Sequence, residues 1–166
     1  FSSFATTMLQ HAKSLVEKLI AQRRLGPDSL VMEIASNDGY LLQYYLRESI
    51  PVLGIEPAVN IARTAEEKGI QTLCEFFGSK VAADLVSEGR LADVMHANNV
   101  LAHVADLNGV IEGFARVLKP GGVVVSESPY VKDLIDGVEF DTIYHEHLCY
   151  YSLTALDNLF ARHGLV

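Results

Sequence analysis

Five short apolar segments alternate with segments of helical spacing, and this alternation restricts the chain to few folds. The apolar runs cover residues 30–35, 51–56, 70–73, 92–98 and 121–128. Helices are expected near residues 39–48, 58–68, 78–88, 106–118 and 152–163, and an amphipathic helix over residues 4–24. Apolar strands separated by helices indicate a mostly parallel sheet that is buried on both faces. We therefore predict an α/β fold with a doubly wound, Rossmann-like sheet.

Composition narrows the function classes. Hydrophobic residues make up 49% and charged residues 20% of the 166 residues, which is typical of one globular domain. The formal net charge of −8 disfavours nucleic acid as a partner, because phosphates would be repelled. No apolar run is long enough to cross a bilayer, so a membrane partner is not expected. The two cysteines, Cys74 and Cys149, are too few for a disulfide framework and suggest reduced thiols in a cytoplasmic protein.

The chain is expected to form one main domain. "GPDS" (residues 26–29) interrupts the first helical pattern, so we assign residues 1–25 to an N-terminal helix and residues 26–166 to a ligand-binding domain. No internal repeat or low-complexity tract divides the sequence. The start at Phe1 and the end in "RHGLV" suggest a piece of a longer protein whose sheet lacks its last strands.

The first strand runs into "EIASNDGY", where a nucleotide would bind beyond the strand end. A dinucleotide site requires G-x-G-x-x-G, but Tyr40 occupies the third position and disfavours a dehydrogenase. With the G-x-G-x-G spacing of methyltransferases, the three positions are Ala35, Asn37 and Gly39. Alanine is small and asparagine tolerates left-handed backbone angles, so the turn remains feasible. Taken alone, this motif is weak.

The second strand ends in "GIEPA", which places Glu56 roughly 20 residues after Glu33, about where an acidic side chain binds ribose hydroxyls. The alternative is a solvated glutamate that caps the helix after Pro57. In "EFFGSK", Phe76 and Phe77 could offer a flat apolar face to an adenine ring or could belong to the core.

The fourth strand ends in "HANNVLAHV". Asn98 and Asn99 can offer amide donors and acceptors to a bound ligand there. His103 follows, and a single histidine at such a position is usually structural.

The stretch "FDTIYHEHLCYYS" (residues 140–152) holds groups suited to proton transfer. His145, Glu146 and His147 are also metal-ligand types. Adjacent residues rarely converge on one ion, and the His-Glu-x-x-His spacing is absent, so we predict no metal site. Tyr150 and Tyr151 are expected to serve packing.

Several of these stretches together resemble a known family. "SNDGYLL", "GIEPA", "FFG", "ADVMHANNVLAHVADLN" and "FDTIYHEHLCYYSL" are similar to the sugar C-methyltransferases, from about residue 30 to the end. The resemblance implies S-adenosylmethionine as cofactor and, as substrate, a nucleotide-linked 4-keto-deoxyhexose that is methylated at carbon 3. Ala35 stands where that family usually has glycine. Full-length members also carry a cysteine-rich zinc module upstream and a second Rossmann-like domain downstream, so we expect a fragment.

The resemblance also implies residue roles. His147 would remove the carbon 3 proton, Tyr144 and Glu146 would position the substrate or tune the base, and His103 would approach from the neighbouring strand end. The cofactor would contact Glu33, Ala35, Asn37, Gly39, Glu56, Phe76, Phe77, Asn98 and Asn99. Two alternatives stay open: a methyltransferase for another small molecule, and a module that binds S-adenosylmethionine without turnover. The sugar, its nucleotide and the oligomeric state are not predicted.

Overall fold

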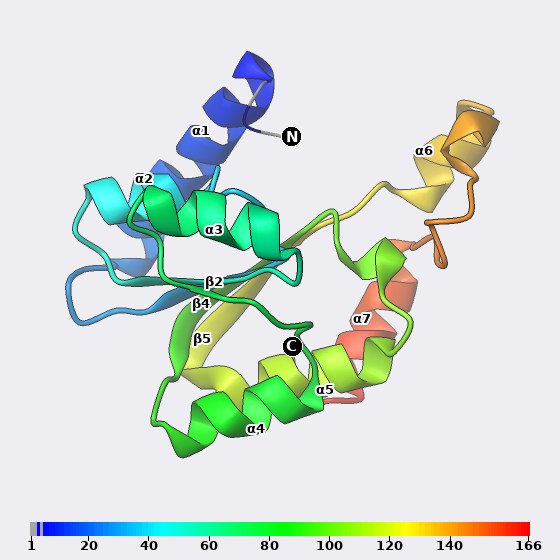
Figure 1. The fold of residues 1–166 in the computed structure, drawn as a ribbon. Helices are drawn as coiled ribbons and strands as arrows, with labels where there is room; N and C mark the ends of the chain where they lie inside the picture. The colour runs from blue at the N-terminus through cyan, green and yellow to red at the C-terminus, as the bar shows by residue number, and fades with distance from the viewer. Residues whose placement is uncertain (1–2, 4) are drawn as a thin grey trace.

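The protein is described by a computed structural model that covers residue 3 and residues 5–166. Its centre is a five-stranded parallel sheet with the order β3-β2-β1-β4-β5 (Figure 1). The strands are β1 (Val31–Ile34), β2 (Val52–Ile55), β3 (Thr72–Leu73), β4 (Ala92–Asn98) and β5 (Leu118–Glu127). The chain builds outward from β1 to β3, then returns to β4 and builds to β5. The predicted doubly wound α/β fold is therefore confirmed, and the order reverses between β1 and β4, where such sheets bind ligands.

Helices cover both faces of the sheet. Figure 1 shows one layer on one face and a second layer on the other. The first layer is α1 (Thr6–Arg23), α2 (Leu42–Arg47) and α3 (Val59–Glu67). The second is α4 (Ser79–Ser87), α5 (Leu107–Val117) and, beside them, α7 (Leu153–Ala161). No helix among the described residues is both long and apolar enough to span a membrane.

Each face of the sheet has its own apolar core. Tyr45 of α2 and Val16 of α1 are fully buried on one face. Phe114 of α5 and Leu85 of α4 are buried on the other face. Burial on both faces explains why the strands are continuously apolar instead of alternating.

The N-terminal helix and the start of the last strand differ in detail from prediction. The helix expected over residues 4–24 is α1, and Phe4 lies outside the described residues. The boundary at residues 25 and 26 stays a prediction. The helix expected to end near residue 118 and the strand expected from residue 121 are not separated, because α5 passes directly into β5. A register shift against β4, with Gly121 at φ 79°, absorbs the Pro-Gly-Gly sequence as a bulge.

Residues after β5 leave the sheet and return to it. They form α6 (Val131–Asp136) and a short 3₁₀-helix, η3 (Phe140–Thr142), neither of which was predicted, and α6 stands away from the sheet in Figure 1. Tyr130 and Tyr151 pair as an isolated parallel bridge, and the Val131 amide donates to the Tyr151 carbonyl at 2.9 Å. The arm formed by residues 129–152 is therefore closed at its base.

Candidate functional site

The loop after β1 has the backbone of a tight nucleotide-binding turn. Ala35, Asn37 and Gly39 have φ angles of 48°, 54° and 76°. These are the three positions that the G-x-G-x-G spacing selected. At Gly39 an added Cβ would collide with the Ile70 side chain, so glycine is required by space as well as by φ. Ala35 and Asn37 hold the same left-handed conformation without glycine.

Glu56 joins this loop to the end of β2. It is 7% exposed, so the interpretation as a solvated cap is wrong in that respect. Its Oε2 accepts from the Asn37 amide at 3.1 Å, and its Oε1 accepts from the Ala58 amide at 3.0 Å. The carboxylate is thus oriented by two backbone donors, and each oxygen retains a lone pair for a further donor.

Glu33 in β1 is a buried acid in an unfavourable environment. It is 1% exposed, and its Oε2 has no hydrogen-bond partner among the described residues. Burial, with added repulsion from Asp38 and Glu56, raises the pKa of Glu33 well above its ordinary value. Asp38 is paired instead with Lys68, at 2.9 Å. An ionised Glu33 therefore needs a positive group that the described residues do not supply.

We expect Glu33 to make stability pH-dependent. Because its pKa is raised on folding, its contribution to stability is complete below the ordinary value of 4.5 and is lost as pH rises through the raised pKa. Glu33→Gln should remove this loss, so that the variant is more stable than the wild type at pH 8. Urea unfolding from pH 5 to pH 8 measures the difference. Glu67→Gln on the exposed part of α3 is the control, and parallel pH profiles for Glu33→Gln and the wild type would contradict the assignment.

An apolar cavity of about 410 Å³ opens beside the loop after β1. Of the predicted site residues, Ala35, Phe76, Phe77 and His103 line it. Of the others, none of which lines the cavity, Tyr144, Glu146 and His147 belong to the arm, and the rest belong to β1, β4 or the turns after β1, β2 and β4, namely Glu33, Asn37, Gly39, Glu56, Asn98 and Asn99. The remaining lining residues, which sequence reasoning missed, are Ile34, Ile55, Pro57, Gly78, Val100, Val104, Ala105, Asp106 and Val110.

Asp106 carried a signal that could have been used. Its carboxylate accepts from the Gly109 amide at 3.0 Å and caps α5. An aspartate just before the first helical residue commonly caps a helix, because its carboxylate accepts from the amide three residues later. The helix over residues 106–118 was predicted, but Asp106 was not included among the site residues although it lines the cavity.

Phe76 and Phe77 have separate positions. Phe77 stacks on Phe114 of α5 with ring centroids 5.4 Å apart, so it belongs to the core as well as to the cavity wall. Phe76 is 82% exposed at the rim. The core interpretation therefore holds for Phe77, and contact of Phe76 with an adenine ring stays a prediction.

Asn98 and Asn99 also differ. Asn99 has φ 55°, and its amide donates to the Glu127 carbonyl at 2.8 Å, so it forms the turn after β4. The side-chain oxygen of Asn98 is buried without a partner among the described residues. Asn98 is therefore the better candidate for a ligand contact.

The structure brings His103, Tyr144 and His147 together. His103 belongs to a 3₁₀-helix after β4, η2 (Leu101–His103), and the other two come from the arm. The ring centroids of His103 and His147 lie 4.8 Å apart, and those of Tyr144 and His147 lie 4.3 Å apart. The Tyr144 hydroxyl is 3.2 Å from His147 Nε2. His103 is more than 40 positions from Tyr144 and His147 in the sequence, and only the fold joins it to them.

Backbone contacts select the tautomer of each histidine. His147 Nδ1 lies 2.9 Å from the Thr142 carbonyl, and His103 Nδ1 lies 2.9 Å from the Glu146 carbonyl. A carbonyl only accepts, so each Nδ1 must carry the proton. In the neutral ring Nε2 then holds the lone pair, and Nε2 of His147 accepts from Tyr144. His147 is therefore arranged to act as a base.

Comparison with known proteins gives the family. A family model described as a methyltransferase domain matches residues 5–166. The chain belongs to the methyltransferase domain family. It is 34% identical over 164 residues to C-methyltransferase NovU of Streptomyces niveus, covering 99% of this chain and 39% of that protein. The chain thus spans about two fifths of the length of this relative.

Solved structures show the same fold. A putative sarcosine dimethylglycine methyltransferase from Galdieria sulphuraria matches with a TM-score of 0.71 and 20% identity, covering 96% of this chain and 62% of that one. A SAM-dependent methyltransferase from Archaeoglobus fulgidus matches with a TM-score of 0.70 and 17% identity, covering 92% and 68%. Family and fold together support S-adenosylmethionine as the cofactor of this methyltransferase domain.

Within the methyltransferase domain, the side chain of Glu146 is not oriented as expected. Its carboxylate lies 3.9 Å from Nε2 of His145, and its side chain is 61% exposed. Its contribution to the cluster is the backbone carbonyl that receives His103 Nδ1. A direct effect of the Glu146 carboxylate on His147 is therefore absent from this arrangement, and substrate positioning remains its predicted role.

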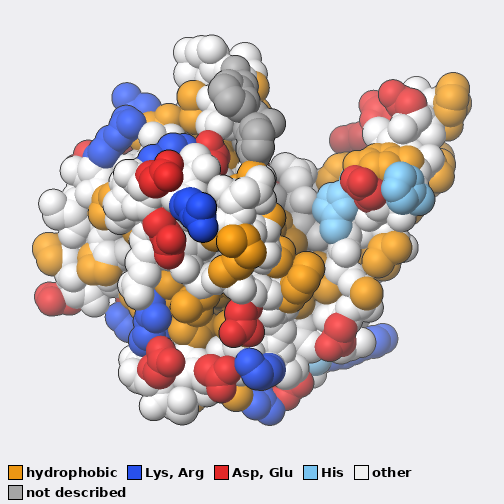
Figure 2. Space-filling view, in the orientation of Figure 1, with side chains coloured by type: hydrophobic (Ala, Val, Ile, Leu, Met, Phe, Trp, Pro, Cys, Tyr) orange, Lys and Arg blue, Asp and Glu red, His pale blue; other side chains and the backbone are white. Residues whose placement is uncertain are grey.

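The arm that carries His147 has an apolar surface. Figure 2 shows its histidines among hydrophobic side chains, apart from the main body. The large apolar residues that are more than half exposed there are Ile135, Val138, Phe140, Ile143 and Leu148.

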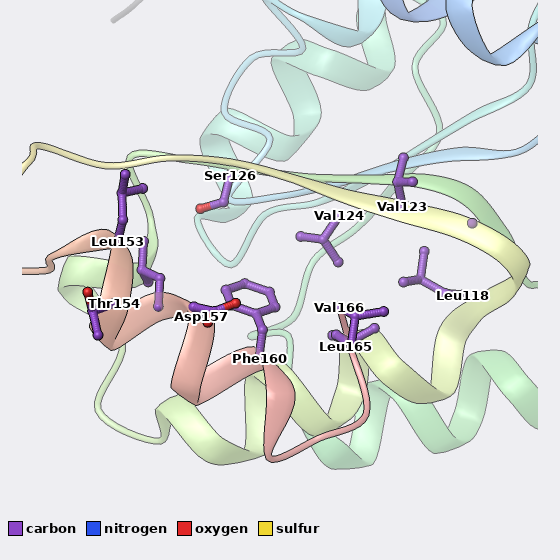
Figure 3. A pocket seen from close by; sticks show the side chains of 12 residues that line it. Leu118, Val123, Val124, Ser126, Leu153, Thr154, Asp157, Phe160, Leu165 and Val166 are labelled. Atoms are coloured by element: carbon purple, nitrogen blue, oxygen red, sulfur yellow. The ribbon is translucent and has the colours of Figure 1, made fainter.

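A larger hollow lies elsewhere in the methyltransferase domain. It measures about 720 Å³ and lies between β5 and α7, as Figure 3 shows. Its walls are mainly aliphatic, with Phe160 from α7, and none of the predicted site residues lines it. Among residues 3 and 5–166, no three His, Cys, Asp or Glu side chains are grouped to hold a metal ion. The grouped chemistry of the described chain is thus at the carboxyl end of the sheet.

Proposed function

We propose that this chain is the catalytic domain of an S-adenosylmethionine-dependent C-methyltransferase that methylates carbon 3 of a nucleotide-linked 4-keto-deoxy sugar. One observation carries the proposal. A histidine whose Nε2 accepts from the Tyr144 hydroxyl is packed against His103, which itself lines the apolar cavity beside the left-handed loop. The 34% identity to a C-methyltransferase supports transfer to carbon. The role in deoxysugar biosynthesis is part of the same proposal.

We assign three parts of the site to three parts of the cofactor. The apolar cavity, with Phe76 at its rim, would take the adenine ring. Glu56, oriented by two amides, would accept from the ribose hydroxyls. The unpartnered oxygen of Glu33 would face the cationic amino-acid end, which fits a carboxylate that needs a positive partner.

His147 would act on the substrate as follows. Its Nε2 takes the proton from carbon 3, and the electrons of the C–H bond form the enolate, with negative charge on the oxygen at carbon 4. Tyr144 turns its hydroxyl from Nε2 to that oxygen and stabilises it. When bound, the cofactor would supply a methyl group on a positively charged sulfur, and a neutral thioether would leave as the carbon nucleophile takes the methyl group. The arm and η2 hold the carbon nucleophile near the cavity, which is a proximity effect.

Calorimetric titration with S-adenosylhomocysteine, beside NAD as a negative control, tests the cofactor half. We expect S-adenosylhomocysteine to bind with a Kd in the low micromolar range, a binding free energy of about −8 kcal/mol, and NAD not to bind. Tighter binding of NAD would contradict the assignment of the loop after β1.

The two phenylalanines should respond differently to truncation. Phe76→Ala should weaken S-adenosylhomocysteine roughly 3- to 10-fold, since ring stacking is worth about 0.5–1.5 kcal/mol, and should leave stability unchanged because the ring is exposed. Phe77→Ala should destabilise the fold by about 2–4 kcal/mol, because it removes a ring packed on Phe114. Calorimetry and urea unfolding of both variants measure these effects. Equal loss of stability in both variants would show that Phe76 is also structural.

A further inference from the structure

The short helix η2 has contacts on two sides. Toward the cavity, Val100, His103 and Val104 form part of the wall. On its other side it is bonded to residues 142–151, which we call the base segment because they contain His147. One 3₁₀-turn therefore separates the proposed cofactor position from the proposed base.

Two hydrogen bonds at this junction join η2 to the exposed part of the base segment. The Leu148 amide donates to the Ala102 carbonyl at 2.8 Å. His103 Nδ1 donates to the Glu146 carbonyl at 2.9 Å, and His103 is itself exposed. Water competes for such bonds, so they alone would hold the base segment weakly.

The third bond is buried and comes from Tyr151. Its hydroxyl donates to the Leu101 carbonyl at 2.9 Å, and the residue is 7% exposed, with its ring in the core beneath η2. Burial raises the pKa of Tyr151, so the hydroxyl keeps its proton at neutral pH. The Leu101 carbonyl also accepts from the Val104 amide, at 3.3 Å. Tyr151 thus supplies the shorter of the two hydrogen bonds to this carbonyl.

We propose that Tyr151 is a positioning residue: its hydroxyl fixes the base segment to η2, so that filling the cofactor cavity is transmitted to His147. The inference rests on the proposed function, because it takes the cavity as the cofactor site and His147 as the base. It assigns a role in the reaction to a tyrosine that the sequence assigned to packing. A 3₁₀-turn has weaker internal hydrogen bonds than an α-helix, so an outside donor has a large influence on its position.

Tyr151→Phe tests the proposal, because it removes the hydroxyl and keeps the buried ring. Tyr130→Phe is the matched control: it removes a hydroxyl from the residue that pairs with Tyr151. The ring resonances of His147, assigned by their absence from His147→Gln, are recorded by NMR with and without S-adenosylhomocysteine. Urea unfolding confirms that each variant is folded.

We expect both variants to bind S-adenosylhomocysteine within about threefold of the wild type. The compound should shift the His147 resonances in the wild type and in Tyr130→Phe, and the shift should be lost in Tyr151→Phe. Exchange of the carbon 3 proton of a 4-keto sugar nucleotide should slow about fivefold in Tyr151→Phe at saturating cofactor, as for loss of one hydrogen bond.

An equal His147 shift in Tyr151→Phe and the wild type would overturn the inference and leave the proposed function intact. Failure of the wild type to bind S-adenosylhomocysteine would overturn the proposed cofactor site instead. In that event the positioning role is tested by the spectra without ligand, in which each variant is compared with the wild type. The His147 resonances should differ from those of the wild type more in Tyr151→Phe than in Tyr130→Phe. Equal differences in the two variants would refute the positioning role.

Discussion

His147→Ala should slow removal of the carbon 3 proton by about 100- to 10,000-fold, the range that a general base contributes. The Nδ1 proton of His147 is held by the Thr142 carbonyl, so Nε2 is the nitrogen that can accept a proton. The measurement is wash-in of deuterium at carbon 3 of a nucleotide-linked 4-keto-deoxyhexose. This partial reaction requires the base but no methyl transfer, so it separates proton removal from methylation.

The neighbouring histidine provides the matched control. The side chain of His145 is 89% exposed, and its ring is 3.9 Å from the Glu146 carboxylate. His145→Ala should exchange deuterium within about threefold of the wild type, as expected for a surface position. Both variants should bind S-adenosylhomocysteine normally. Similar exchange rates in His147→Ala and the wild type would show that another group is the base.

Glu56→Gln should weaken S-adenosylhomocysteine by roughly 100-fold. Both carboxylate oxygens accept from backbone amides, and the amide of glutamine can replace only one of these acceptors. Hydrogen bonds to a charged group are worth about 1.5–3 kcal/mol. The uncharged variant also loses the charge-assisted hydrogen bonds that the ribose hydroxyls would donate to the carboxylate. Calorimetry measures the affinity, with Glu66→Gln on exposed α3 as the control for loss of one negative charge.

A comparison with the 2′-deoxy analogue of S-adenosylhomocysteine separates ribose binding from damage to the loop. In the wild type the analogue should bind more weakly than the parent compound. In Glu56→Gln this difference should disappear, because the group that recognised the hydroxyl is gone. If the difference persists in the variant, Glu56 orders the loop between Asn37 and Ala58 without binding the ribose.

The Glu56 and Glu33 carboxylates illustrate two kinds of buried acid. Glu56 has two amide donors, one to each of its carboxylate oxygens. Glu33 has an oxygen with no donor among the described residues, and its pKa is raised by burial. A cationic ligand beside Glu33 would favour ionisation, so the proposed contact with the cofactor would couple binding to proton release at this residue.

Local sequence patterns predicted most of the fold. Short apolar runs gave β1, β2, β4 and β5 nearly at their observed positions, because strands buried on both faces must be apolar throughout. The glycine spacing also located Ala35, Asn37 and Gly39, since the requirement for left-handed φ lies in the backbone of single residues. The bulge in β5 was missed because it depends on register against β4.

The site depended more on tertiary structure. The residue types in "YHEH" indicated proton chemistry, and the family resemblance singled out His147. The contact of His147 with His103 required the arm to fold back on η2. The pairing of His147 Nδ1 with Thr142 and the turn of Glu146 toward His145 were set by the conformation of the arm itself.

The sequence by itself determined the βαβ order, the left-handed loop and the identity of the titratable groups, because these follow from hydrophobic periodicity and from the conformations open to each residue. Only the tertiary structure separated Phe76 from Phe77, left Glu33 unpaired and set Tyr151 beneath Leu101. Burial and hydrogen-bond partners come from segments distant in the sequence, and no local pattern contains them.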